Sequence, residues 1–214
     1  MSILVVGSVA FDSIRTPFAD KTDLLGGSAT HFSIAASFFS RVRLVAVVGD
    51  DFGDEQMALF RDHEVDTGGL QRVPGKTFRW AGEYGEDPNN RTTLDTQLNV
   101  FADFQPELPE AWTDTPVVFL ANIDPELQWQ VLEQVRAPEI VAADTMNFWI
   151  DSKRDALVRT LGRVGILLIN DSETRDLTGK TNVFEAADTI RAMGPDVVVI
   201  KRGEHGVIVA DSEG

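Results

Sequence analysis

Cysteine is absent from this sequence. Its absence excludes disulfides, thiolate nucleophiles and cysteine-based zinc sites. The three histidines, His31, His63 and His205, are scattered and show no His-x-x-x-His or other metal-ligand spacing, which argues against a zinc or iron centre. A Walker-type phosphate loop is also lacking, and no Gly-x-Gly-x-x-Gly follows the first apolar run. The sequence therefore disfavours P-loop and dinucleotide-binding proteins.

Long hydrophobic runs and basic clusters are both lacking. Apolar runs such as Ile166–Ile169 and Val197–Ile200 are strand-sized, far shorter than the roughly 20 residues of a membrane-spanning helix. The N-terminus has neither a basic region nor a small-residue cleavage site. A net charge of −15 and a pI near 4.5 disfavour a nucleic-acid partner. We therefore expect a cytoplasmic protein without membrane or nucleic-acid partners, acting on a small molecule.

Strand and helix patterns alternate along most of the chain. The 214 residues are 43% hydrophobic and 25% charged, as in a globular protein with one core. Short apolar runs predict buried strands, and apolar residues at helical spacing predict helices between them. The expected strands are Ile3–Val6, Leu44–Val48, Val117–Ala121, Ile140–Ala143, Ile166–Asn170, Val197–Ile200 and Gly206–Ala210, and the expected helices are Ala29–Phe39, Asp54–His63, Pro125–Val135, Lys153–Leu161 and Val183–Met193. This order predicts an α/β fold with one mostly parallel sheet.

The alternation breaks between Leu70 and Phe104. Within this region Phe78, Trp80 and Tyr84 alternate with smaller or polar residues, and a turn-rich stretch follows them. The pattern predicts an antiparallel hairpin inserted into the α/β domain. Its aromatic side chains either cover a substrate or pack against a second copy of the chain, and the sequence does not separate these uses.

Polar and glycine residues after the first strand form one candidate site. Ligands of parallel α/β sheets bind beyond the carboxyl ends of the strands. Asp12 could accept hydroxyl donors from a polyol there, or it could be a solvated or capping carboxylate. Gly26 and Gly27 precede a helix, where they either let a ligand approach free backbone N–H groups or form a plain turn. Each residue alone leaves both interpretations open.

A second candidate site follows two later strands. Asn170 and Glu173 lie three residues apart, a spacing that suits either oxygen ligands near a hydrated Mg²⁺ or a helix N-cap with its capping-box partner. Lys201, Gly203 and Gly206 follow the strand Val197–Ile200 and could meet a polyphosphate, although a charged hairpin turn explains them equally well.

Taken in order, several segments resemble the ribokinase-like, PfkB family of carbohydrate kinases. They are Val6–Asp12, Gly26–Thr30, Val48–Gly53, Asn170–Glu173 and Lys201–Gly206. The resemblance covers essentially the whole chain. It implies a ribokinase-like three-layer α/β/α domain over residues 1–214, with a mostly parallel central sheet. It also implies a small β-sheet lid formed by about residues 13–24 and 70–104.

The same resemblance implies a function and assigns residues to it. The implied reaction is ATP-dependent transfer of the γ-phosphoryl group to a hydroxyl of a sugar, nucleoside or similar polyol, with Mg²⁺ as cofactor. Catalysis of this kind depends mostly on positioning and charge stabilisation. The implied substrate-binding residues are Asp12, Gly26, Gly27, Ser28 and His31, and the implied nucleotide- and phosphate-binding residues are Asn170, Glu173, Lys201, Gly203 and Gly206, with Glu173 acting on Mg²⁺ indirectly. Lids of this family often build dimers, so we also expect a homodimer through the lid.

Two features depart from the family pattern. His31 stands where many sugar kinases of the family carry a substrate-binding Asn, which puts ribose or fructose specificity in doubt. The family's Gly-Ala-Gly-Asp segment, which supplies the anion hole and the catalytic Asp, would lie beyond Gly214, so no catalytic base is assigned within residues 1–214. We therefore expect the chain to be C-terminally incomplete. The alternative is a non-catalytic nucleotide- or sugar-binding regulatory protein on the same fold.

Overall fold

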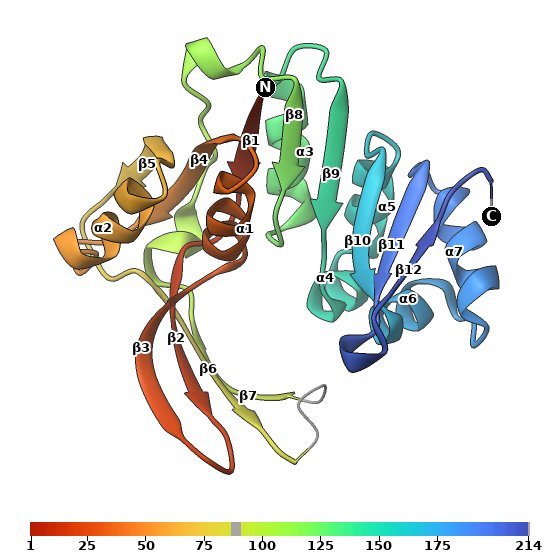
Figure 1. The fold of residues 1–214 in the computed structure, drawn as a ribbon, viewed down its shortest axis with the longest axis horizontal. Coiled ribbons are helices and arrows are strands. Elements are labelled where there is room, and N and C mark those ends of the chain that lie inside the picture. The colour runs from red at the N-terminus through yellow and green to blue at the C-terminus, as the bar shows by residue number, and fades with distance from the viewer. Residues whose placement is uncertain (87–90, 214) are drawn as a thin grey trace. The chain divides into compact units, whose positions relative to one another are not determined.

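The computed structural model describes residues 1–86 and 91–213. The chain forms two compact units, Met1–Pro109 and Glu110–Gly214. Each unit contains parallel strands packed against helices (Figure 1). Among the described residues, no helix is long and apolar enough to cross a membrane.

One part of the first unit consists of three parallel strands and two α-helices. Strand β4 (Arg41–Val48) pairs with β1 (Ser2–Val6) on one side and with β5 (Asp66–Arg72) on the other. Their apolar runs are buried because helix α1 (Ser28–Ser37) packs against both β1 and β4, and α2 (Asp54–Asp62) packs against β5.

A separate four-stranded sheet completes the first unit. Its order is β3 (Asp20–Gly26), β2 (Ala10–Arg15), β6 (Phe78–Tyr84), β7 (Arg91–Gln97). Strands β2 and β6 run parallel, and the outer pairs are antiparallel. Phe78, Phe101 and Phe104 stack in series where the sheet meets the short helix η1 (Asn99–Asp103). Leu70, which the sequence places in the insertion, lies in β5 instead.

The second unit is a sheet with five α-helices and two short 3-10 helices among its described residues. Strands β8 (Val117–Leu120), β9 (Ile140–Asp144), β10 (Ile166–Asn170) and β11 (Val197–Lys201) are parallel, and β12 (Val207–Ala210) returns antiparallel to β11. The unit's helices are η2 (Glu110–Trp112), α3 (Pro125–Gln134), α4 (Asn147–Ser152), α5 (Arg154–Leu161), α6 (Asp171–Thr178), α7 (Val183–Arg191) and η3 (Gly203–His205). Helices α3, α5 and α7 lie behind the strands in Figure 1.

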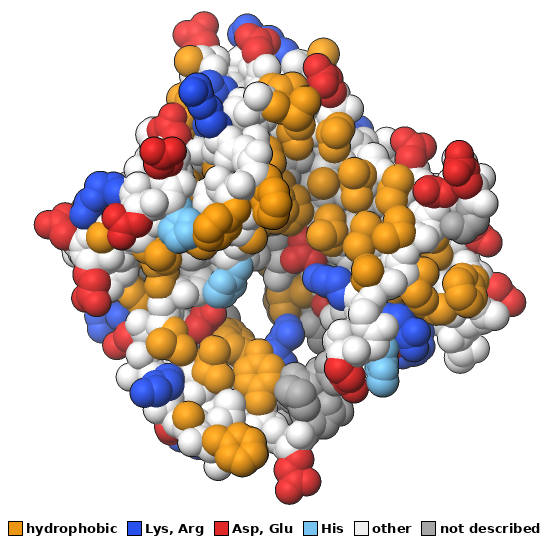
Figure 2. Space-filling model, viewed as in Figure 1, with side chains coloured by type: hydrophobic (Ala, Val, Ile, Leu, Met, Phe, Trp, Pro, Cys, Tyr) orange, Lys and Arg blue, Asp and Glu red, His pale blue; other side chains and the backbone are white. Residues whose placement is uncertain are grey.

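The two faces of the second unit's sheet differ in burial. Leu167, Ile169 and Val198 are fully buried, whereas Val207 and Val209 on β12 are 56% and 52% exposed. Figure 2 shows hydrophobic side chains gathered over these strands on the face toward the viewer. The alternation follows from strand geometry, since successive side chains point to opposite faces.

The structure confirms the predicted alternation of strands and helices. The predicted return strand after the final turn is β12. Several elements had no counterpart in the prediction. They are β5, the short helix α4, the 3-10 helices η1 and η2, and α6, whose start at Asn170 was considered only as an N-cap. Strand β5 lacks a strong apolar pattern because it contains Gly68 and Gly69, which weaken the strand signal.

Candidate functional site

In the first unit, Asp12 lies directly against the Gly26–Gly27 backbone. A Cβ atom on Gly26 would overlap the Asp12 carboxylate, so only glycine leaves room for this carboxylate. Burial raises the pKa of Asp12, and the nearby His31 and the hydrogen bond from the Gly27 backbone partly offset that rise. The β2–β3 register shifts between Asp12 and Ile14, and bulges of this kind often re-aim side chains beside functional sites.

The start of helix α1 is held by Ser8, in the loop after β1. The Ser28 backbone N–H donates to Ser8 Oγ at 3.1 Å, and the Ala29 N–H donates to the Ser8 carbonyl at 3.0 Å. The two serine hydroxyls lie 3.0 Å apart. Gly27 has a φ of 94° and packs on the Ser8 backbone, so any side chain there would be strained and would clash. The predicted contact residue Ser28 therefore has a structural partner of its own.

His31 is exposed on the first turn of α1. It is close enough to Asp12 for its charge to lower that carboxyl's pKa. The structure thus brings Asp12, Gly26, Gly27 and His31 together, as the sequence predicted for a substrate-binding site. Whether they contact a substrate stays a prediction.

Trp80 lies beside Asp12 on the neighbouring strand. Strands β2 and β6 pair with Asp12 opposite Trp80, so both side chains leave the same face of the sheet. The Trp80 ring lies over Gly82, two residues further along β6, where a Cβ atom would overlap it. Its Nε1 is 3.4 Å from Thr93 Oγ1 on β7. The sequence singled out Trp80 as a lid aromatic but did not place it next to Asp12.

Arg79 joins the four-stranded sheet to the turn after β4. Its guanidinium donates to Asp51 at 3.0 Å and also binds Asp23 on β3. It lies over the Phe11 ring, with the guanidinium carbon 4.9 Å from the ring centroid. Asp51 also accepts hydrogen bonds from the backbone and hydroxyl of Thr77, at 2.7 and 2.6 Å. This network is not predicted from the sequence, because its members are far apart in the chain.

In the second unit, Asn170 and Glu173 form a complete capping box at the start of α6. Asn170 Oδ1 accepts from the Glu173 N–H at 2.8 Å, and Glu173 Oε2 accepts from the Asn170 N–H at 2.9 Å. Ser172 donates to the same Asn170 oxygen at 2.8 Å. Glu173 is only 5% exposed. The capping interpretation is therefore correct for the geometry, and a role toward phosphate or Mg²⁺ stays a prediction.

Lys201 and Asp144 form an ion pair at the carboxyl ends of β11 and β9. Lys201 Nζ lies 3.2 Å from Asp144 Oδ1. Burial raises the pKa of Asp144, and the Lys201 charge partly offsets the rise. Buried Gln128 donates to the Asp144 carbonyl at 3.1 Å and so holds this strand end in place. Asp144 was not among the predicted site residues, although its position after an apolar strand is the same signal that selected Asn170.

Gly203 and Gly206 shape the turn between β11 and β12. Their φ angles are 56° and 83°, in the region that favours glycine. The Arg202 N–H donates to the Gly206 carbonyl at 2.9 Å, which closes the turn around η3. The predicted hairpin is confirmed. Glu204 and His205, which lie between the two glycines, are exposed to solvent.

The strand ends of the second unit suit a hydrated cation and phosphate better than a metal ion coordinated only by protein side chains. No group of three or more His, Cys, Asp or Glu side chains within residues 1–86 and 91–213 has the geometry to hold a metal ion. Mg²⁺ differs from most protein-bound metals because it keeps several waters and needs only one or two carboxylates beside substrate phosphates. Asp144 and Glu173 are carboxylates at these strand ends, and Lys201 is the cation paired with Asp144. A role of these residues toward Mg²⁺ or phosphate stays a prediction.

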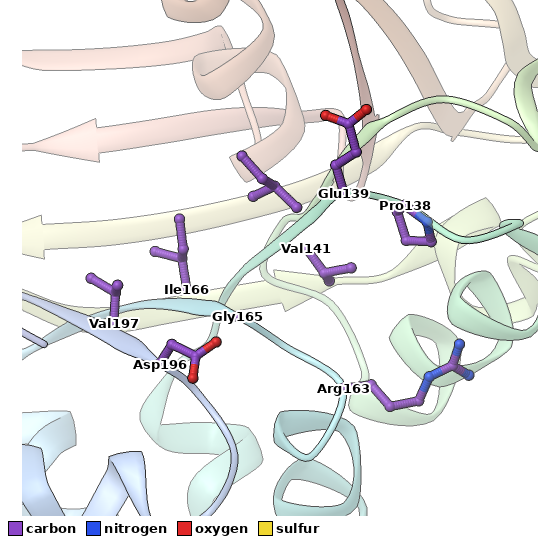
Figure 3. Close-up of a pocket in the computed structure, with 9 residues that line it drawn as sticks. Pro138, Glu139, Val141, Arg163, Gly165, Ile166, Asp196 and Val197 are labelled. Atoms are coloured by element: carbon purple, nitrogen blue, oxygen red, sulfur yellow. The ribbon is translucent and has the colours of Figure 1, made fainter. Parts of the chain in front are cut away.

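A hollow of about 310 Å³ lies at the opposite edge of the second unit's strands (Figure 3). The residues that line it include Pro138, Gly165 and Asp196, which lie just before the amino ends of β9, β10 and β11. The Arg163 side chain points away from Ile166 and Val197 in this view. None of the candidate site residues lines it, and ligands of parallel sheets bind at the carboxyl edge. The hollow is therefore separate from the candidate site.

Comparisons with known proteins found relatives in sequence and in fold. A cytidine kinase of Thermococcus kodakarensis is 28% identical over 214 residues, covering 99% of this chain and 76% of that protein. The crystal structure of a PfkB protein from Polaromonas sp. JS666 has a TM-score of 0.80 at 19% identity, covering 100% of this chain and 81% of that chain. A putative ribokinase II from E. coli, in complex with ATP and Mg²⁺, has a TM-score of 0.81 at 16% identity, covering 100% and 76%.

The structural neighbours confirm the ribokinase-like α/β fold class. Residues 3–214 match the sequence profile of the pfkB family carbohydrate kinase. Because this match spans nearly the whole sequence, the chain belongs to the pfkB family of carbohydrate kinases, which are phosphotransferases.

Proposed function

We propose that this protein transfers the γ-phosphoryl group of ATP to a hydroxyl of a sugar or nucleoside. The observation that carries the proposal is the half-buried Asp12 carboxylate, held against Gly26 and Gly27 on the four-stranded sheet. Its oxygens can accept two hydroxyl donors, as recognition of a polyol requires. The similar cytidine kinase and the ATP complex of the similar ribokinase II support this substrate class and this donor.

The second unit would hold the nucleotide and its cation. Lys201 would contact phosphate oxygens, and Gly203 and Gly206 would let the nucleotide approach the turn backbone. Asp144 and Glu173 would hold Mg²⁺ through its water shell, as suits an ion with few protein ligands. Bound Mg²⁺ would supply charge neutralisation of the transferring phosphoryl group. Asn170 would keep Glu173 in position through the capping box.

The substrate site would be closed by the four-stranded sheet. We propose that residues of β2, β3, β6 and β7 act as a lid, and that two copies of the chain meet through it in the cytoplasm. The exposed leucines Leu24 on β3 and Leu94 on β7 support an interface on this sheet. Light scattering of the purified protein tests the dimer, which is rejected if the protein stays monomeric at micromolar concentration.

The direct test is a phosphorylation assay with Mg²⁺·ATP and a panel of sugars and nucleosides. The resemblance assigns the catalytic base to the family's Gly-Ala-Gly-Asp segment, which does not occur in residues 1–214, so the assay uses the product of the full reading frame. We expect ADP release with at least one polyol, and loss of that release in Asp12→Asn. A panel that gives binding without ADP release would favour a non-catalytic binding protein, and a panel without either would overturn the proposal.

A further inference from the structure

The Trp80 indole lies flat along the face of the four-stranded sheet. Gly82 is buried in a sheet whose neighbouring strand β7 is exposed along its length. It is the Trp80 ring that covers Gly82, because a Cβ atom there would overlap three ring carbons. Any other residue at this position would push the indole off the sheet. The glycine therefore fixes the orientation of the ring.

The Trp80 side chain is only partly buried, and a planar cation lies over its ring. The Arg91 guanidinium lies over the ring, with its carbon 5.9 Å from the centroid. This distance is at the outer limit of about 6 Å for a cation–π contact, and Arg91 is itself exposed. A flat cation thus already occupies the position that a heterocyclic ring would take, and it is weakly held there.

The ring lies one strand away from the carboxylate that would bind hydroxyls. Asp12 pairs with Trp80 on β6 and with Leu24 on β3. Neighbouring strands are about 4.8 Å apart, so a hydroxyl-binding group and an aromatic platform stand side by side on one face. Leu24, which is 40% exposed, and Ile14, which pairs with Gly82, add apolar side chains to the same face of the sheet.

We infer that Trp80 is a specificity-determining residue that stacks on a planar ring of the substrate, so the phosphoryl acceptor is a nucleoside-like polyol and not a free sugar. The inference rests on the proposed function. A free sugar would satisfy Asp12 and leave the indole face in water. A nucleoside joins a hydroxyl-bearing ring directly to a planar heterocycle, and the two parts match the two neighbouring groups on the sheet.

Titration calorimetry without ATP separates the two kinds of ligand. The probes are cytidine, uridine and adenosine, each compared with ribose and fructose. We expect at least one nucleoside to bind about tenfold or more tightly than either sugar, and Trp80→Leu to remove roughly that factor, the scale of one base–aromatic stack. Trp129→Leu is the matched control, because Trp129 packs against Arg159 and Arg163 in the other unit.

A second variant tests the orientation of the ring while keeping the tryptophan. Gly82→Ala should displace the indole and weaken nucleoside binding as Trp80→Leu does, with sugar affinity within about twofold of the wild type. Equal affinity of Trp80→Leu and wild type for nucleosides would overturn the inference. So would phosphorylation of ribose or fructose in preference to every nucleoside, although that result would leave the proposed kinase function intact. If neither class binds or is phosphorylated, the inference and the proposed function both fail.

Discussion

Arg79 Nη2 donates a hydrogen bond to Asp51 Oδ2 across 3.0 Å, and this bond links the four-stranded sheet to the turn after β4. The same guanidinium reaches Asp23 on β3 and covers Phe11, the residue before Asp12. Burial raises the pKa of Asp51, but the hydrogen bonds from Thr77 and Arg79 outweigh it, so the pKa is lowered. The sheet that carries the candidate substrate carboxylate is thus anchored at its base.

Removing this anchor should loosen substrate binding more than it destabilises the protein. In Arg79→Met, loss of two partly exposed ion pairs should cost about 1 kcal/mol of unfolding free energy. We expect KM for the polyol to rise about tenfold with kcat less affected, since Asp12 is less well positioned. Steady-state kinetics and hydrogen exchange of residues 20–26 measure both effects.

Arg15→Met is the matched control for this variant. The Arg15–Asp20 pair also joins neighbouring strands of the sheet, but both side chains are more than half exposed and far from the turn after β4. An equal rise in KM in both variants would show that Arg79 has no special positioning role.

Replacing Asp12 by Asn should separate stability from binding. The folded-state pKa of Asp12 lies above its ordinary value of 3.8, so the wild-type unfolding free energy should fall as pH rises from 3.8 through the raised pKa. Asp12→Asn should lack this fall and be at least as stable at pH 7. Its affinity for the polyol should drop about 10- to 100-fold, because a charged hydrogen-bond acceptor is lost.

Denaturant unfolding between pH 3 and pH 8, with calorimetry at pH 7, measures these two effects. If Asp12→Asn is markedly less stable than the wild type at pH 7, the carboxylate has a structural role that the geometry does not reveal.

Gly26→Ala should disturb the carboxylate while leaving Asp12 in the sequence. The added methyl group would overlap the Asp12 side chain, and displacement of a positioned group by about 1 Å can cost about 10²-fold in rate. Gly85→Ala is the control, because a Cβ atom at Gly85 would have no neighbour within 4 Å in the part of the chain that the structure describes. Measuring kcat/KM for both variants tests whether the methyl group at residue 26 impairs catalysis through Asp12. Equal values in the two variants would mean that Asp12 does not need the space above Gly26.

The capping and nucleotide roles of Asn170 can be separated with a second helix cap. Asn170 caps α6 and Asn182 caps α7, each by accepting from backbone N–H groups. Asn170→Ala and Asn182→Ala should each lower the unfolding free energy by about 1 kcal/mol. Only Asn170→Ala should also weaken Mg²⁺·ATP binding, measured by calorimetry. If both variants bind Mg²⁺·ATP like the wild type, Asn170 is a helix cap and nothing more.

Much of the fold was predictable because the patterns that mark its strands and helices lie within short segments of the sequence. The runs Ile3–Val6 and Ile166–Ile169 are apolar throughout, as buried parallel strands are, and helical spacing marked Val183–Met193. Strand β5 escaped prediction because its glycines and polar residues gain their strand conformation from pairing with β4.

The candidate site was predictable in part. Asp12, Gly26, Asn170 and Lys201 were identified by their place after strands and by family resemblance. Asp144 was missed, because its significance depends on the ion pair that it forms with Lys201, more than fifty residues away in the chain.

The sequence by itself determined the α/β class, the order of the elements and the family, because hydrophobic periodicity and short motifs are properties of neighbouring residues. Only the tertiary structure decided which side chains meet. Trp80 stands beside Asp12 and Arg79 reaches Asp51 because β6 pairs with β2 in one particular register, and a shift of one residue would send each side chain to the other face.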